Sequence, residues 1–377
     1  MRRKLMFVVN VDWFFISHRL PIALGALGQG YEVHLVCGET GRLEELERLG
    51  LIVHPLMIVR GKAGIGNNLK TFLEILSLFK HVQPDIVHLV TIKPVLFGGL
   101  AARLLGIKSV VTAVSGLGFI FVDSGVKARL RRMVVGLLYR LALGKKNLKV
   151  IFQNPDDRDR LCSLAGIQRN KTEMIRGSGV DLGKYQESVA PSGVPIVVLV
   201  ARLLNDKGVM EFVEAGSQLK HQGYHVRFCL VGDIDPDNPA SLTADNLASI
   251  EANGEIELWG HRSDIPAVLS SATIVVLPSY REGLPKVLLE AAASGRAVVT
   301  TDVPGCRDAV EEGVTALLVP PRSSSSLAKA MASLLDDPAR CNAMGLAGRK
   351  LAEREFDVSK VVERHLKIYA ELEAGAL

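Results

Sequence analysis

The chain has 377 residues, which is long enough for two domains that each bury a substantial core. Hydrophobic residues make up 48% of the sequence, which excludes a disordered protein, and no apolar run is long enough to predict a membrane-spanning helix. The formal net charge is +5, and the five cysteines are widely spaced with no C-x2-C pair. This cysteine usage predicts a reduced, cytoplasmic protein without structural zinc.

Short apolar runs alternate with helical patterns along the whole chain. Strands are expected at 5–11, 32–37, 86–89, 109–114, 150–153, 195–200, 226–231, 256–259, 273–277 and 297–300. Helices are expected between them, for example at 69–81, 207–222 and 325–335. This strand–helix alternation predicts an α/β protein with parallel sheets covered on both faces.

A polar segment with glycine and proline at 183–193 interrupts the alternation and predicts an interdomain linker. The strand–helix pattern restarts after it. We therefore expect two doubly wound, Rossmann-like domains at 1–185 and 194–357. A last helical segment follows at 358–377.

The most informative segment follows the strand expected at 273–277 and contains two carboxylates, Glu282 and Glu290. Pro285 suits the first turn of a helix, and Gly283 lets a ligand approach the backbone just before that helix. Open amides at a helix start favour an anion or a polar ligand. Glu290 lies in an apolar stretch and needs a partner, such as two neighbouring sugar hydroxyls. From the spacing alone, a capping Glu282 and a salt-bridged Glu290 explain the pattern equally well.

The form E-G-x-P-x4-E after a strand resembles the donor-site signature of retaining glycosyltransferases of family four, which have the GT-B fold. A second match lies upstream, where the strand at 197–200 runs into Arg202-x4-Lys207-Gly208. In the family this element grips the diphosphate of the donor. The two motifs occur in the family's order, about eighty residues apart. The resemblance implies two Rossmann-like domains facing across a cleft, with the last helix crossing back to the first domain.

The resemblance also implies a role for each motif residue. Glu282 binds the donor sugar with the amides of Gly283 and Leu284, and Glu290 binds the ribose hydroxyls. Arg202 and Lys207 stabilise the leaving diphosphate, because fixed cations must absorb its charge where no metal does. In this family the leaving phosphate takes the proton of the acceptor, so no enzyme nucleophile is implied. The resemblance therefore implies that the enzyme needs no cofactor and no metal.

Charge is divided unevenly between the two halves of the chain. Residues 1–190 carry 27 Lys and Arg against 15 Asp and Glu, whereas residues 191–377 carry 18 against 25. Much of the excess lies between 127 and 149, where basic residues that include Lys127, Arg129, Arg131 and Arg132 are separated by apolar ones. This pattern favours a basic amphipathic helix on an anionic membrane surface, although a helix with a solvated basic face fits it too. Nucleic acid is disfavoured, because no recognition motif accompanies the patch.

Three segments, 10–21, 114–118 and 279–283, are similar to bacterial enzymes that extend undecaprenyl-diphosphate glycans. Among these are N-acetylgalactosaminyltransferases acting on diphospho-undecaprenyl diacetylbacillosamine, and O-antigen and capsule transferases. The resemblance covers nearly the whole chain. It implies a UDP-sugar donor, a polyprenyl-diphosphate saccharide acceptor and a location on the inner face of the cytoplasmic membrane. The first domain is then expected to bind the acceptor and the second domain the nucleotide sugar.

Four residues of the first domain are candidates for acceptor binding. Asp12 either orients an acceptor hydroxyl or caps a helix, and His18 either contacts the acceptor or is a structural helix residue. Ser115 and Gly116 follow a strand, where they either wrap a phosphate or sugar or form a tight turn. The loop after the first strand has no glycine, where many relatives have two.

Residues 233–237 contain the D-x-D pattern that binds a metal and a diphosphate in the other large glycosyltransferase fold. We interpret this loop as lining the nucleotide site through Asp233, with no metal. Three alternative functions are weighed. A sugar-nucleotide 2-epimerase shares the fold, but the two motifs argue against it. A dehydrogenase is disfavoured because no G-x-G-x-x-G follows the first strand, and a non-enzymatic scaffold protein would leave the two motifs unexplained.

Overall fold

The computed structural model describes residues 2–56, 58, 64–116, 126–188, 191–236 and 238–375. The chain forms two compact units, one of residues 1–178 with 359–377 and one of residues 179–358. The first unit therefore ends at 178, where the sequence suggested 185, and the second begins at 179 rather than 194. Residues 179–185 pack on the second unit, since Val180 exchanges backbone hydrogen bonds with Phe356 and Val358 and Tyr185 is buried.

The first unit is built on a seven-stranded parallel sheet with the order β3-β2-β1-β4-β5-β6-β7. Its strands are β1 Lys4–Val11, β2 Glu32–Gly38, β3 Ile52–Pro55, β4 Ile86–Val90, β5 Ser109–Val114, β6 Leu148–Phe152 and β7 Thr172–Met174. The central strands are buried on both faces, as expected for a parallel sheet between two helix layers.

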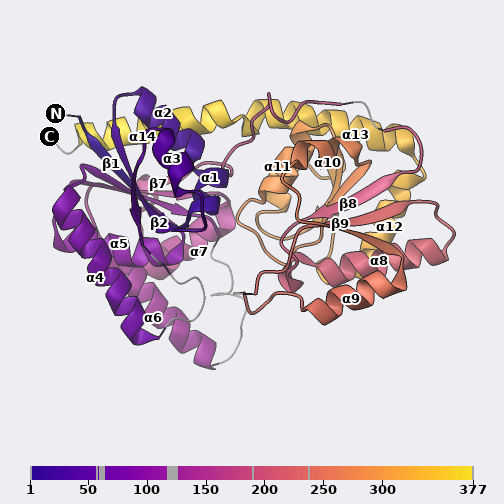
Figure 1. Cartoon of the computed structure of the whole chain (residues 1–377), viewed down its shortest axis with the longest axis horizontal. Helices are drawn as coiled ribbons and strands as arrows, with labels where there is room; N and C mark the ends of the chain where they lie inside the picture. The colour runs from indigo at the N-terminus through magenta and orange to yellow at the C-terminus, as the bar shows by residue number, and fades with distance from the viewer. Residues whose placement is uncertain are drawn as a thin grey trace. The chain divides into compact units, whose positions relative to one another are not determined.

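Two helix layers cover this sheet (Figure 1). The helices are α1 Asp12–His18, α2 Leu20–Gly28, α3 Leu43–Arg48, α4 Ile65–Val82, α5 Ile92–Leu104, α6 Val126–Ala142, α7 Pro155–Ala165 and α14 Val358–Ala374. Alternate residues of β1 enter two different cores: Met6 and Val8 pack with α4 to α7, and Phe7 packs with α1, α2 and α14. The C-terminal helix α14 is thus part of the first unit's core, through residues such as Tyr369.

The second unit has a six-stranded parallel sheet with the order β10-β9-β8-β11-β12-β13. Its strands are β8 Ile196–Val200, β9 Arg227–Val231, β10 Ile256–Gly260, β11 Ile274–Leu277, β12 Ala297–Thr301 and β13 Ala316–Val319. Its helices include α8 Val209–His221, α9 Ala244–Asn253, α10 Ile265–Ser271, α11 Lys286–Ala293, α12 Ser324–Leu335 and α13 Pro338–Leu351. The strands that the sequence analysis expected are all present, and the short strands β3, β7 and β13 were missed.

In each unit the strand order reverses once, between β1 and β4 in the first and between β8 and β11 in the second. Ligands of doubly wound sheets bind at the carboxyl ends of the strands beside this reversal. The residues that follow these four strands are therefore where a binding site is expected.

Candidate functional site

The loop between β11 and α11 carries the E-G-x-P segment. It begins where the fully buried strand β11 ends, and α11 begins at Lys286. Pro285 is the N-cap residue of α11, with φ −72° and ψ 124°, one position before the first turn that the sequence suggested. Pro285 itself makes no side-chain capping hydrogen bond. The segment 278–285 is thus an irregular loop at the reversal of the sheet, as a ligand-binding loop requires.

Glu282 is held by two side chains of the same unit. The Lys207 ammonium lies 2.5 Å from Glu282 Oε1, and the Ser279 hydroxyl donates to the same oxygen at 2.7 Å. Both members of the ion pair are mostly buried, with 19% of the Lys207 side chain and 12% of the Glu282 side chain exposed. Lys207 ends a single 3-10 turn after β8, so the two loops beside the reversal of the sheet meet through this pair.

Two glycines allow the backbones around Glu282 to pack closely. Gly208 has φ +71°, and a Cβ there would overlap the carbonyl of Pro278. Gly305, with φ +85°, follows β12, and its Cβ would lie 2.5 Å from the carbonyl oxygen of Glu282. The 305 loop is part of the site that the sequence analysis missed. In the sequence, a Pro-Gly pair such as 304–305 is a turn signal and carries no sign of a ligand site.

Arg202, which the family resemblance assigned to the leaving diphosphate, is paired with a carboxylate of the same unit. Its guanidinium pairs with Asp235 at 2.6 Å, with 45% of the Arg202 side chain exposed. The backbone brings them together, because Leu203 N–H donates to the carbonyl of Asp233 at 2.9 Å. The Asp233 carboxylate accepts a hydrogen bond from the N–H of the next residue, Ile234, at 2.8 Å. Residue 237 of the D-x-D segment lies outside the described residues.

Glu290 has protein partners where the sequence suggested sugar hydroxyls. The Tyr185 hydroxyl donates to Glu290 Oε1 at 2.7 Å, and the Lys286 ammonium lies 3.5 Å from the same oxygen. Burial, followed by the charge of Glu290, raises the pKa of Tyr185. Tyr185 was missed because its polar, glycine-containing surroundings predicted a linker. Leu284 is buried in the core of this unit, so only its backbone is available to a ligand.

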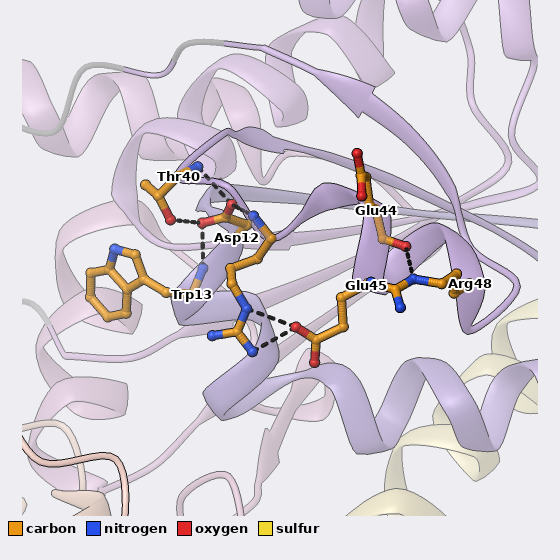
Figure 2. A network of polar contacts seen from close by, with 7 residues as sticks. Asp12, Trp13, Thr40, Glu44, Glu45 and Arg48 are labelled. Atoms are coloured by element: carbon orange, nitrogen blue, oxygen red, sulfur yellow. Dashed lines mark hydrogen bonds and ion pairs between the residues drawn. The ribbon is translucent and has the colours of Figure 1, made fainter.

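In the first unit the Asp12 carboxylate ties the end of β1 to the loop after β2 (Figure 2). Its oxygens accept from the N–H groups of Trp13 at 2.6 Å, Thr40 at 2.7 Å and Arg42 at 3.3 Å, and from the Thr40 hydroxyl. Burial alone would raise the pKa of Asp12, but these hydrogen bonds outweigh it and the pKa is lowered. Because Asp12 is fully buried, this arrangement favours the structural alternative over acceptor binding.

The other three acceptor candidates lie in different settings. His18 Nδ1 is 3.2 Å from the carbonyl of Phe14, and the two rings stack with centroids 4.1 Å apart, as in a structural helix residue. Ser115 and Gly116 follow β5 directly, and Gly116 has φ +109°. The Ser115 hydroxyl is buried without a hydrogen-bond partner in the described part of the chain. Residues 117 and 118 of this segment lie outside it.

The basic segment forms the helix α6, as expected. Arg129 is exposed on it, whereas the side chains of Lys127, Arg131 and Arg132 lie outside the described residues. Its second half exposes apolar side chains, with Met133 63%, Val134 52%, Leu137 58% and Leu141 41% exposed. None of the helices in the described ranges combines the length and apolar character that a membrane crossing requires.

Two doubly wound sheets carry a lysine–glutamate pair at one reversal point and, near the other, a serine hydroxyl without a partner among the described residues. This is the arrangement of the class of α/β proteins that bind polar ligands at the carboxyl ends of their strands. Comparison with known proteins identifies the family within this class. Residues 194–337 match the model described as "Glycosyl transferases group 1", and residues 4–154 match "Glycosyl transferase 4-like".

Relatives along the full chain agree. An N,N'-diacetylbacillosaminyl-diphospho-undecaprenol alpha-1,3-N-acetylgalactosaminyltransferase of Campylobacter jejuni is 31% identical, over 94% of this chain and 97% of that protein. A UDP-Gal:alpha-D-GlcNAc-diphosphoundecaprenol alpha-1,3-galactosyltransferase of Escherichia coli is 23% identical, over 91% and 89%. The crystal structure of a glycosyltransferase from Rickettsia africae aligns with TM-score 0.78 and 19% identity, over 98% of both chains. The protein therefore belongs to the group 1 glycosyltransferases, the family-four hexosyltransferases with the GT-B fold.

Proposed function

We propose that this enzyme transfers an N-acetylhexosamine, such as N-acetylgalactosamine, from a UDP-sugar to an undecaprenyl-diphosphate-linked saccharide with retention of configuration. The observation that carries the proposal is the 31% identity with the Campylobacter jejuni N-acetylgalactosaminyltransferase across 94% of the chain. The name of the Escherichia coli relative supports UDP as the nucleotide and a diphosphoundecaprenol-linked sugar as the acceptor. Such a reaction serves the assembly of O-antigen, capsule or glycoprotein glycans.

The geometry around Glu282 supports this reaction in the second unit. Departure of UDP from the sugar leaves negative charge on the diphosphate, and the Lys207 ammonium, which pairs with Glu282, supplies a fixed cation at this site. Glu282 is held by Lys207 and Ser279, so its carboxylate is oriented to accept a hydrogen bond from the donor sugar. We assign it binding and positioning rather than nucleophilic attack. In this proposal the leaving phosphate takes the proton of the acceptor, and no metal takes part.

The charge and shape of α6 support contact with the membrane that carries the acceptor. Exposed Met133, Leu137 and Leu141 are interspersed with the exposed cations Arg129 and Arg140. Apolar side chains that enter the acyl boundary beside cations that meet anionic headgroups are typical of helices lying in a membrane surface. The proposed location is the inner face of the cytoplasmic membrane.

The decisive experiment offers the purified enzyme a panel of UDP-hexoses and UDP-N-acetylhexosamines with a short-chain polyprenyl-diphosphate saccharide in detergent. We expect a product heavier by one N-acetylhexosamine and an equal amount of free UDP, in the presence of EDTA as well as without it. Release of UDP without a lipid product would reject the acceptor but keep the donor. No UDP release with any donor of the panel would overturn the proposal.

A further inference from the structure

Among the buried polar atoms of the first unit that have no hydrogen-bond partner in the part of the chain that the structure describes, three lie at or just beyond the carboxyl ends of strands next to one another in the sheet. They are Asn10 Oδ1, Thr91 Oγ1 and Ser115 Oγ. A buried polar atom that is left unpaired costs free energy, so native proteins usually pair such atoms with protein, water or ligand. Three such atoms on neighbouring strand ends therefore indicate a site that a ligand completes.

The sheet places these three residues at the carboxyl ends of neighbouring strands. Asn10 lies at the end of β1, Thr91 directly after β4 and Ser115 directly after β5, and these strands are consecutive in the sheet. Val8 pairs with Leu89, so Asn10 and Thr91 both lie two residues beyond the same registered pair. The strand order reverses between β1 and β4, which is where doubly wound sheets bind their ligands.

Thr91 has a backbone conformation that supports a functional role. Its φ of 73° and ψ of 166° lie in a region that is almost restricted to glycine, and a β-branched residue there is strained. Strain of this kind tends to persist at functional sites, where surrounding structure holds the residue in place. Here the conformation occurs at the N-cap of α5, yet the threonine hydroxyl makes no capping hydrogen bond. The strained conformation is therefore not explained by helix capping.

We propose that Thr91, together with Asn10 and Ser115, forms a subsite that hydrogen-bonds the acceptor sugar of the lipid-linked saccharide. Asn10 Oδ1 only accepts, so the ligand must present a donor, which the hydroxyl or acetamido N–H of a sugar does and a fully ionised diphosphate does not. The hydroxyls of Thr91 and Ser115 both donate and accept, and so match neighbouring sugar hydroxyls. The inference rests on the proposed function, because it takes the acceptor to be a saccharide.

The test measures steady-state transfer by Thr91→Val, which removes the hydroxyl and keeps the shape of the side chain. We expect the KM for the acceptor to rise roughly five- to tenfold, with the KM for the UDP-sugar unchanged, since one uncharged hydrogen bond is lost. Thr91→Ser, which keeps the hydroxyl, should restore most of the acceptor affinity. The matched control is Thr112→Val, because Thr112 Oγ1 is also buried and unpartnered but lies inside β5, away from the strand ends. It should leave both KM values unchanged.

A second pair of variants tests the direction of the hydrogen bond at residue 10. Asn10→Asp keeps an accepting oxygen and should bind the acceptor better than Asn10→Leu, which has none. Equal acceptor KM values for wild type, Thr91→Val and Asn10→Leu, with wild-type transfer intact, would overturn the inference and leave the proposed function standing. Absence of wild-type transfer with every polyprenyl-diphosphate saccharide tested would instead reject the proposed function. A Thr91→Val effect confined to the KM of the UDP-sugar would assign the residue to the donor and overturn the acceptor subsite.

Discussion

Lys207 and Glu282 form a mostly buried ion pair that links the loops following β8 and β11, with 2.5 Å between Nζ and Oε1. The two residues are far apart in the sequence but adjacent at the reversal of the second sheet. Lys207 balances the charge of the Glu282 carboxylate, and in the proposed reaction the same cation faces the leaving diphosphate. The proposed reaction would therefore couple substrate binding and charge stabilisation through this one contact.

Glu282→Gln removes the negative charge and retains the shape of the side chain. We expect kcat to fall by about a hundredfold or more, because the oriented acceptor of the donor-sugar hydrogen bond is weakened and Lys207 loses its partner. Circular dichroism and the thermal midpoint should remain close to those of wild type. Full activity in this variant would remove Glu282 from the donor site.

Tyr185→Phe deletes the hydroxyl that donates to buried Glu290 at 2.7 Å. We expect the free energy of unfolding to fall by about 1–2 kcal/mol, because the carboxylate loses a hydrogen bond in a site from which water is largely excluded. The control is Tyr224→Phe, whose hydroxyl donates to Asp336 at 2.9 Å on the exposed surface. Denaturant unfolding of both variants measures the loss in the free energy of unfolding. Equal losses would show that burial does not make the Tyr185–Glu290 hydrogen bond more stabilising than an exposed one.

Gly305→Ala introduces a Cβ that would lie 2.5 Å from the carbonyl oxygen of Glu282. We expect the loop that carries Glu282 to shift and kcat/KM for the UDP-sugar to fall about tenfold or more, since small displacements in a site are costly. The matched control is Gly30→Ala, where φ is also +85° but nothing lies within 4 Å of the new Cβ. That variant carries the same backbone strain without the clash and should keep its activity. Equal losses of activity in Gly305→Ala and Gly30→Ala would show that backbone strain, rather than the clash with Glu282, causes the effect.

Leu137→Asp replaces an apolar side chain of α6 that is 58% exposed. We expect weaker co-sedimentation with vesicles containing phosphatidylglycerol, because the carboxylate opposes both insertion and the anionic surface. The matched control is Leu346→Asp on α13, which is 41% exposed in the second unit. Wild type should also lose vesicle binding at high salt. Unchanged sedimentation of Leu137→Asp would exclude this face of α6 as the membrane contact.

The buried histidines of the first unit predict a loss of stability in acid. His365 is fully buried, and its pKa is lowered to about 3, first by burial and then by the charge of Arg19. Between the ordinary histidine pKa of 6.5 and 3, the unfolded chain binds a proton that the native chain does not, so stability falls as the pH falls. Burial also lowers the pKa of His88, which adds to the effect.

The corresponding measurement is the thermal midpoint of wild type and His365→Asn from about pH 7 to about pH 5. We expect the midpoint of wild type to decrease more steeply, because its free energy of unfolding falls by up to about 1.4 kcal/mol per pH unit for each histidine that titrates only in the unfolded chain. Parallel slopes for the two proteins would exclude His365 as a source of the pH dependence.

The sequence by itself determined the strand–helix alternation, the parallel sheets and the family. Runs such as 273–277 are apolar enough to predict buried strands. The spacing of the glycine, proline and glutamates in 282–290 predicts a loop followed by a helix, because these features depend on residues close together in the chain. Short strands such as β3 were missed, because their few residues carry too weak a pattern. Both membership of the group 1 glycosyltransferases and the GT-B fold were predicted correctly from the two motifs and confirmed.

The tertiary structure alone decided which side chains meet. It paired Arg202 with Asp235, Glu290 with Tyr185 and Asp12 with the backbone near Thr40, none of which the sequence spacing indicated. It also brought the ends of β1 and β4 together, with Thr91 and Asn10 each two residues beyond one registered pair, because strand order and register are set by packing of the whole unit. A one-dimensional pattern reports the burial of each residue, whereas a site depends on contacts between residues far apart in the chain.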